Sequence, residues 1–181
     1  MLRFVLKRKK SSYDFRVNPK KPDSFENNWK NNRQDWLYIY DDNVEMYRAR
    51  CQSVANYCFG DMATASTVAH GDTIAEGDFQ VRCFADPRSF HGHVHEIIRT
   101  RDIDGEWIDH QAMQTSENGF QNGRWLIHTN YSKRYASDTT YAWSAGCFII
   151  SSFDMDAFGV ILNAYDVKPG DIINGTIVEE D

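Results

Sequence analysis

The residues best suited to chemistry in this chain are a histidine and a cysteine that lie close together in the sequence. His128 closes a short apolar run, and Cys147 follows nineteen residues later among small residues. A free thiol is only slightly ionised at neutral pH, so a nucleophilic cysteine needs a base that takes its proton. An imidazole can be that base. The pair therefore indicates thiolate catalysis, and the alternative interpretation is a buried structural cysteine beside a strand-end histidine.

The residues next to this pair suggest a substrate cleft. Gly146 directly precedes the thiol and leaves room for a substrate carbonyl, while Ser144 and Ala145 keep the turn compact. Backbone N–H groups at such a turn are candidates for an oxyanion hole. We expect three further residues to line the same cleft, namely Trp143, Thr129 and Tyr131.

The order and spacing of these residues resemble the signature of the L,D-transpeptidase catalytic domain. Fifteen residues separate His128 from the run Ser144-Ala145-Gly146-Cys147, where the family has serine or threonine, histidine, glycine and cysteine. The segment 74–81 is similar to the family's turn into a Gly-x-Phe-x-Val strand. Papain-like and NlpC/P60-like enzymes place the cysteine first, and caspase-like enzymes have a much longer gap.

The resemblance implies a ping-pong acyl transfer on peptidoglycan stem peptides or on other peptides that contain D-amino acids. Cys147 would attack the carbonyl of an L-residue bonded to a D-residue, and His128 would accept the thiol proton. The thioester would then pass to an amine in transpeptidation, or to water in an L,D-carboxypeptidase. The family orients its histidine through a backbone carbonyl, and neither a cofactor nor a metal is implied.

Two positions depart from the family pattern. Ala145 replaces the usual histidine, and Ile149 stands where many members carry an arginine associated with substrate recognition. These differences bear on the substrate more than on the nucleophile. A hydrolase or a toxin that targets cell walls on the same fold therefore stays open as an alternative.

A second group of residues supports a different interpretation. His91, His93 and His95 alternate along an expected strand, so their side chains would share one face. Three imidazoles on one face are a candidate transition-metal site. Further candidate ligands are Glu96 and His110. In this alternative the chain is a metal-binding protein and the cysteine is structural, although we favour a polar strand face that lines a groove or meets solvent.

Composition and charge restrict the class of protein. The 181 residues suffice for one domain with its own core. The formal net charge of −6 and the lack of a basic stripe argue against a nucleic-acid binder. No run has transmembrane length, and the apolar start of the chain is too short for a signal-peptide core. A cell-wall enzyme of this sequence would lie in the envelope or be secreted, and would need another export route.

Hydrophobic patterning predicts a mainly β fold, a β-sandwich or barrel as in the L,D-transpeptidases, with one helix after Cys147. We expect a polar arm over residues 1–35, including a solvated basic run over 7–10, and a catalytic domain over 36–181. Expected strands cover 36–40, 44–48, 79–84, 93–98, 106–108, 124–128 and 172–178, and residues 111–123 are expected as a loop.

The expected helix begins at Ser151 or Ser152 and ends near Tyr165. Its apolar face is expected to include Phe153, Ala157 and Ile161, with Phe158 and Leu162 beside them. Three cysteines are expected as small buried residues, namely Cys51, Cys58 and Cys83, and a Cys51–Cys58 bridge is left open.

Overall fold

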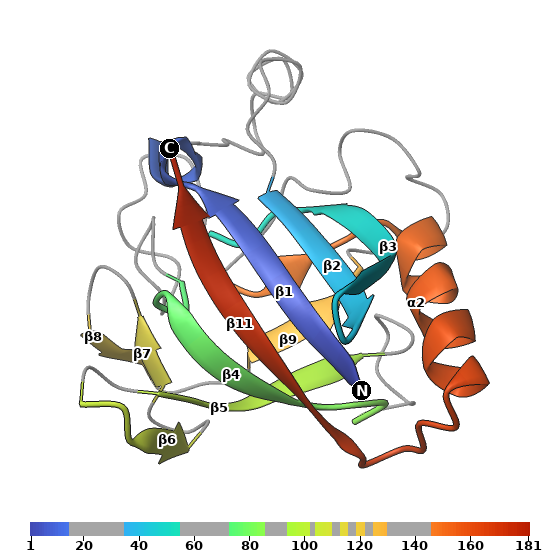
Figure 1. Ribbon diagram of the computed structural model, residues 1–181. Helices are drawn as coiled ribbons and strands as arrows, with labels where there is room; N and C mark the ends of the chain where they lie inside the picture. Colours follow the sequence, from blue (N-terminus) through green and yellow to red (C-terminus); the bar gives the residue numbers. More distant parts are fainter. Residues whose placement is uncertain are drawn as a thin grey trace.

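The computed structural model describes residues 1–14, 35–54, 73–85, 94–101, 104–109, 113–115, 119–121, 125–129 and 146–181. Figure 1 shows a strongly curved sheet with one α-helix against its side. The strands are β1 (Leu2–Lys9), β2 (Asp35–Asp41), β3 (Val44–Cys51), β4 (Gly77–Arg82), β5 (His95–Arg101), β6 (Trp107–Asp109), β7 (Met113–Thr115), β8 (Gly119–Gln121), β9 (Trp125–His128), β10 (Phe148–Ile149) and β11 (Ile172–Glu180). A 3-10 helix, η1 (Lys10–Asp14), follows β1, and α2 (Ser152–Ala164) follows β10.

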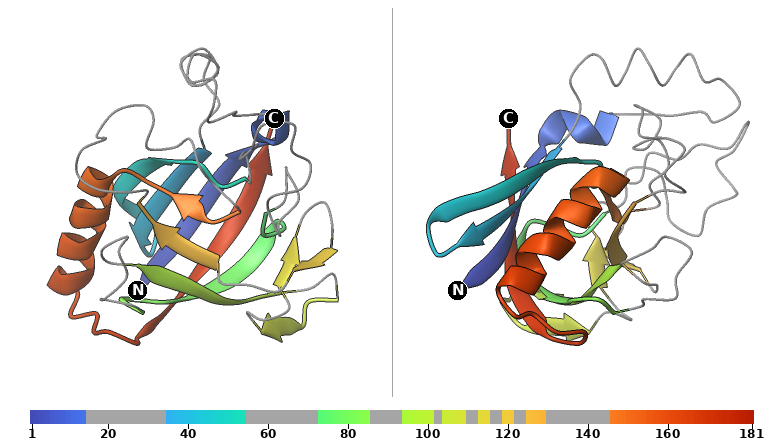
Figure 2. Two further views of the ribbon diagram at one scale, coloured as in Figure 1. Left: turned by 180° about the vertical axis from the view of Figure 1, so that it is seen from behind. Right: turned by 90° about the vertical axis from the view of Figure 1, so that its right-hand side faces the viewer.

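The main sheet has nine strands and closes almost completely on itself. Its strand order is β10-β9-β5-β4-β11-β1-β2-β3, and β6 pairs with β5. At the two ends of this order, Gln52 after β3 and Ile149 in β10 exchange two backbone hydrogen bonds of 2.9 Å. These bonds draw the sheet into a barrel, with β9 and β10 in the wall behind β1 and β2 (Figures 1 and 2). The predicted mainly β fold with one helix is confirmed.

The barrel interior is filled by alternate residues of the strands. In β1 these residues are Leu2, Phe4 and Leu6, which meet Phe79 of β4 and Phe148 of β10 inside the barrel. Phe79 and Phe148 pack edge to face with ring centroids 5.9 Å apart. Because successive strand residues point to opposite faces, the same alternation sends the neighbouring side chains outward.

The N-terminal segment is not the solvated arm that we expected. Residues 2–9 form β1, which lies between β11 and β2 and is parallel to β11. Arg8, expected in a solvated basic run, is fully buried and continues the inward row of Leu2, Phe4 and Leu6. The prediction was wrong because charge was given more weight than the alternation of apolar residues along this strand.

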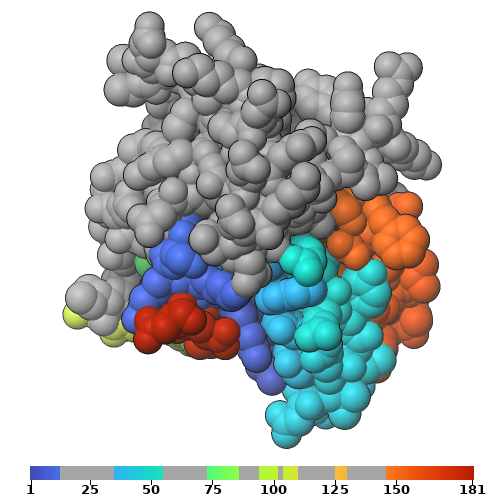
Figure 3. All heavy atoms as spheres, turned by 90° about the horizontal axis from the view of Figure 1, so that it is seen from above, coloured from blue at the N-terminus to red at the C-terminus, as the bar shows by residue number. Residues whose placement is uncertain are grey.

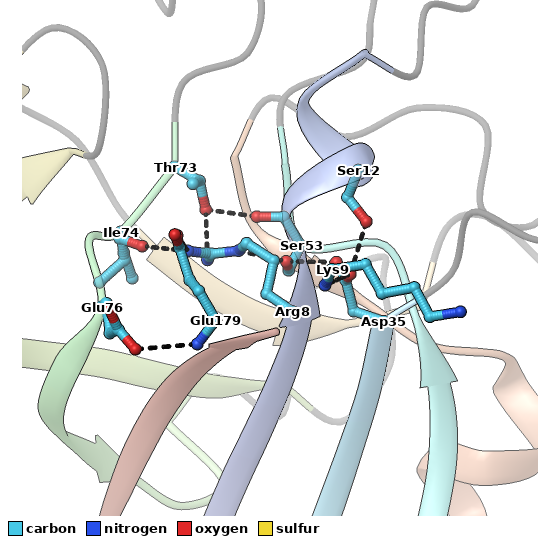
Figure 4. A network of polar contacts seen from close by, with 9 residues as sticks. All are labelled: Arg8, Lys9, Ser12, Asp35, Ser53, Thr73, Ile74, Glu76 and Glu179. Atoms are coloured by element: carbon cyan, nitrogen blue, oxygen red, sulfur yellow. Dashed lines mark hydrogen bonds and ion pairs between the residues drawn. The ribbon is translucent and has the colours of Figure 1, made fainter. Parts of the chain in front are cut away.

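A polar network surrounds Arg8 at one end of the barrel (Figure 4). The Arg8 guanidinium donates to Ser53 Oγ at 2.9 Å, to Thr73 Oγ1 at 2.9 Å and to the Ile74 carbonyl at 2.9 Å. It also forms an ion pair of 3.2 Å with Glu179. Buried charges are tolerated when their donors are satisfied, and this guanidinium has several acceptors.

Asp35 is the buried carboxylate of the same network. It accepts hydrogen bonds from the Ser12 hydroxyl at 2.6 Å, the Ser53 hydroxyl at 2.6 Å and the Lys9 backbone N–H at 2.9 Å. Burial raises the pKa of Asp35, whereas the charge of Arg8 and the three hydrogen bonds lower it. Ser53 joins the two charges, because its hydroxyl accepts from Arg8 and donates to Asp35.

The predicted hairpin and helix are confirmed, but the predicted burial of one helix residue, Phe153, is wrong. β2 and β3 pair antiparallel across a turn where Asp42 has a φ of 50°. Ser151 is the N-cap of α2, and its hydroxyl accepts from the Asp154 N–H at 3.1 Å. Figure 3 shows α2 beside the β2–β3 hairpin. Phe153, predicted on the buried face, is 75% exposed because Met155, Phe158, Gly159 and Leu162 make that face instead.

The remaining sequence predictions for strands hold with one correction. β4, β5, β6, β9 and β11 lie within a few residues of their predicted ranges. Residues 111–123, expected as a loop, include the two-stranded antiparallel pair of β7 and β8. Among the described residues, no helix is long and apolar enough to cross a membrane.

Candidate functional site

His128 ends β9, and Cys147 directly precedes β10. The two strands are neighbours in the rear wall of the barrel (Figure 2, left). β9 and β10 run parallel, with Phe148 beside Ile127 and Ile149 beside His128. Ile127 and Phe148 point into the core, so alternation places His128 and Ile149 on the opposite, outer face. The two predicted catalytic residues thus lie at neighbouring strands, His128 at the end of β9 and Cys147 directly before β10.

The ring orientation of His128 is set by the backbone. Nδ1 lies 2.8 Å from the carbonyl oxygen of Thr129. A carbonyl oxygen only accepts hydrogen bonds, so Nδ1 carries the proton in the neutral ring and Nε2 is the basic nitrogen. Thr129, predicted to line the cleft, therefore contacts the imidazole through its backbone. This contact has the form that the resemblance implied.

Gly146 is required by the local backbone and by packing. Its φ is +111°, in the region that glycine adopts without strain. A Cβ at this position would overlap the Trp125 indole, with Cη2 only 2.8 Å away. The sequence alone suggested that this glycine leaves room for a substrate carbonyl. The structure adds a different reason, because the indole occupies the side-chain space just before Cys147.

The described cysteines differ in their surroundings. Cys51 and Cys83 are buried free thiols, as predicted for buried small residues. Burial is the main cause that raises the pKa of Cys51 well above its ordinary value, and it raises that of Cys83 to about 12. Cys147 is only partly buried. Of the described thiols, it is the one that a substrate or reagent in solution can reach.

Glu96 shares the outer face with His128, and sequence reasoning considered it only as a metal ligand. It pairs with Leu126 across β5 and β9, two residues from His128, and is 7% exposed. Diagonal neighbours on an antiparallel pair are about 7–8 Å apart, within reach of long side chains. A carboxylate in this position favours an imidazolium. Only the sheet register shows this relation, since Glu96 is far from His128 in sequence.

The histidine cluster is described only at His95. This residue lies inside the barrel, where its Nδ1 accepts a hydrogen bond from the Phe84 N–H at 3.0 Å. Its ring packs edge to face against Phe84 with centroids 5.0 Å apart. Nδ1 of His95 therefore accepts a backbone hydrogen bond in the core rather than facing solvent. In the part of the chain that the structure describes, no three His, Cys, Asp or Glu side chains are grouped as metal ligands.

Several predicted site residues lie outside the described residues. They are Trp143, Ser144, Ala145 and Tyr131 of the predicted cleft, His91, His93 and His110 of the alternative metal site, and Cys58. Ile149 stands where the L,D-transpeptidase pattern often has an arginine. It is among the described residues and is fully buried beside His128. A guanidinium at this position would have to be desolvated, so the isoleucine fits its surroundings.

Comparison with known proteins places the chain in a family. No family model matches it. It is 49% identical over 179 residues to an uncharacterized protein of Treponema pallidum (strain Nichols). The chain belongs to the family of this treponemal protein. The alignment covers 98% of the chain and 80% of the relative, so the shared unit is not confined to the segment around His128 and Cys147.

In this member of the treponemal family, replacing Gly146 by alanine is expected to reduce the free energy of unfolding by about 2–4 kcal/mol. The cause is twofold, because alanine is strained at a φ of +111° and its Cβ overlaps Trp125. Urea unfolding measures the loss. Gly105→Ala is the matched control, since Gly105 has a φ of +82° with no atom near the missing Cβ. A loss no larger than that of the control would contradict the packing role of Trp125.

Proposed function

We propose that this protein is a cysteine acyl-transferase of the L,D-transpeptidase type that acts on peptidoglycan stem peptides. The observation that carries the proposal is the parallel pairing of β9 with β10, which sets His128 at the end of one strand and Cys147 directly before the next. The Thr129 carbonyl adds support, because it leaves Nε2 as the basic nitrogen of His128. The order and spacing of the two residues resemble this family and no other thiol enzyme considered above.

The reaction follows from the roles of these two side chains. Nε2 of His128 takes the proton of the Cys147 thiol, and the thiolate sulfur bonds to the carbonyl carbon of the L-residue. The C–N bond to the D-residue then breaks, and the imidazolium returns the proton to the leaving amine. An incoming amine releases the acyl group from the thioester as a new amide. Water releases it as a carboxylic acid, which is the carboxypeptidase outcome of the same intermediate.

The buried outer face favours this chemistry. His128 is 6% exposed and its neighbour Ile149 is fully buried, so the ion pair formed by proton transfer is largely removed from bulk water. Electrostatic effects are stronger in such surroundings than in water. The nearby Glu96 is a positioning group, which would stabilise the imidazolium without touching the substrate.

Selective alkylation of the native protein tests the nucleophile. With iodoacetamide, intact-mass spectrometry of a Cys58→Ser background should show one fast adduct at Cys147, because the two other remaining thiols, those of Cys51 and Cys83, are buried and hard to ionise. The fast adduct should disappear in Cys147→Ala and form about tenfold more slowly in His128→Ala.

Cys83→Ala is the control variant, because it removes a buried thiol and should leave the fast adduct unchanged. Equal labelling of every cysteine, or no labelling at Cys147, would contradict a catalytic role. Bound metal that disappears on His93→Ala would instead support the metal-binding alternative.

A further inference from the structure

A second polar site lies on the outer faces of β11, β4 and β5. Figure 1 shows β11 and β4 at the front of the barrel. There the sheet is hollowed by a cavity of about 430 Å³. Its lining includes Arg3, Asp78, Arg101, Trp107, Asn174 and Thr176. β9 and β10 lie in the rear wall, so this hollow is separate from His128 and Cys147. Its volume is in the range of small-molecule sites.

The polar groups of the hollow are held in place by one another. Thr176 Oγ1 donates to Asp78 Oδ1 at 2.6 Å, and Arg101 Nε donates to Asp78 Oδ2 at 3.3 Å. In the next row, Gln80 Nε2 donates to the side-chain carbonyl of Asn174 at 2.8 Å. These contacts place a carboxylate, a hydroxyl and a carboxamide side by side on a rigid sheet, which is a preorganised set of donors and acceptors.

The hollow also contains an aromatic ring, Trp107, and a cation without a described ion-pair partner, Arg3. The guanidinium groups of Arg101 and Arg99 lie 4.1 Å and 5.2 Å from the centroid of the Trp107 ring. Arg3 lies over Tyr40 at 4.9 Å and donates to the Asp42 carbonyl, but among the described residues no carboxylate is its ion-pair partner. Arg3 therefore has capacity for an anion at the rim.

This combination favours a sugar over a phosphate chain. Trp107 is partly exposed, and the part of its indole that the two guanidinium groups leave open offers an apolar surface to a sugar ring. The mixed donors and acceptors match the hydroxyl and acetamido groups of the sugar. The carboxylate of Asp78 would repel a phosphate backbone but accepts a hydroxyl hydrogen bond. We propose that this hollow binds a segment of an acidic glycan, with one sugar ring against Trp107 and a sugar carboxylate at Arg3.

The choice of a peptidoglycan strand as this glycan rests on the proposed function, because that strand carries stem peptides amide-bonded to some of its lactyl groups and free lactyl carboxylates where the peptide has been removed. A glycan site on one wall would hold the polymer while the stem peptide reaches the other. The binding itself is independent of catalysis, so it can be measured in the Cys147→Ala variant.

Isothermal titration calorimetry of the full chain carrying Cys147→Ala tests this site. The probes are peptide-free peptidoglycan glycan strands, uncharged chitohexaose and a short oligothymidylate. The glycan strands should bind saturably, and chitohexaose should bind about tenfold more weakly because it lacks a partner for Arg3. Trp107→Ala and Arg3→Met should each weaken binding of the strands by about tenfold.

Trp36→Ala is the matched control, since Trp36 also lies beneath two guanidinium groups, those of Arg48 and Arg50, but lines no part of the hollow. It should bind the strands like the parent. Asn174→Asp, an exposed change that keeps the side-chain shape, should weaken binding without affecting folding. The proposal would be overturned if the strands do not bind. It would also be overturned if Trp107→Ala and Asn174→Asp each bind the strands as tightly as the parent, or if the parent binds the oligothymidylate more tightly than the strands. If the strands bind but the wild type leaves stem peptides intact, the catalytic proposal alone is wrong.

Discussion

Replacing Arg8 by methionine is expected to lower the free energy of unfolding by about 3–5 kcal/mol. Methionine keeps most of the aliphatic volume but removes the charge and every donor of the guanidinium. The variant would remove the hydrogen bonds that the guanidinium donates to Ser53, Thr73 and the Ile74 carbonyl. The carboxylate of Asp35 would remain fully buried with its hydrogen bonds but without the cation. Urea unfolding followed by circular dichroism measures the loss.

The pH dependence of this loss identifies its cause. Burial already raises the pKa of Asp35, and the charge of Arg8 opposes that rise, so Arg8→Met should raise the pKa further. A carboxyl whose pKa is higher folded than unfolded loses stability as pH rises from the unfolded value through the folded one. The deficit of Arg8→Met should therefore be larger at neutral pH than at mildly acidic pH. A loss that is independent of pH would contradict the electrostatic explanation.

Two further variants separate charge from packing. In the double variant Arg8→Met/Asp35→Asn the unpaired charge is removed, so part of the lost stability should return. Lys7→Met is the matched control, because Lys7 is the outward neighbour on the same strand, with its ammonium 5.1 Å from the Tyr38 ring centroid. Its substitution should cost less than about 1 kcal/mol. Equal losses for Arg8→Met and Lys7→Met would contradict a special role for the buried guanidinium.

The fold was predictable where one local signal was sufficient. Asp42 and Asn43 mark the turn between β2 and β3, and Ser151 marks the start of α2. The burial of Arg8 was missed because its evidence is not local. Its neighbours in β1 are Lys7 and Lys9, and the acceptors that make Arg8 a buried residue come from residues 53, 73, 74 and 179. No short window of the sequence contains both Arg8 and its acceptors.

In the candidate site, too, the sequence selects residues that lie close together in the chain and misses those that only the fold brings near. His128 and Cys147 are close in the chain, so their order and spacing were sufficient to select them. Glu96 was placed near them only by the pairing of β5 with β9. The Thr129 carbonyl and the indole behind Gly146 are likewise contacts of the folded chain, which depend on backbone direction and on positive φ. Sequence patterns identify reactive side chains better than the groups that orient them.

Cys147→Ala is expected to abolish turnover of tetrapeptide muropeptides, a loss of at least about a thousandfold in kcat. Among the described residues, the other two thiols, those of Cys51 and Cys83, are buried in the barrel and do not replace the nucleophile. His128→Ala should lose about 10²–10⁴ in kcat, the usual contribution of a general base. Liquid chromatography with mass spectrometry follows the release of the terminal D-residue, and added D-methionine distinguishes exchange from hydrolysis.

The Glu96→Gln variant tests whether the imidazolium is stabilised by a neighbouring acid. Glutamine keeps the shape but removes the charge, so the pKa of His128 should fall in the variant and the acid limb of the rate profile should move to lower pH. Cys83→Ser should leave the kinetics unchanged, because that thiol lies in the core. Turnover that survives in Cys147→Ala would show that Cys147 is not the nucleophile. Turnover that is lost in Cys147→Ala while the pH profile of Glu96→Gln stays that of the wild type would support the nucleophile and contradict the role of Glu96.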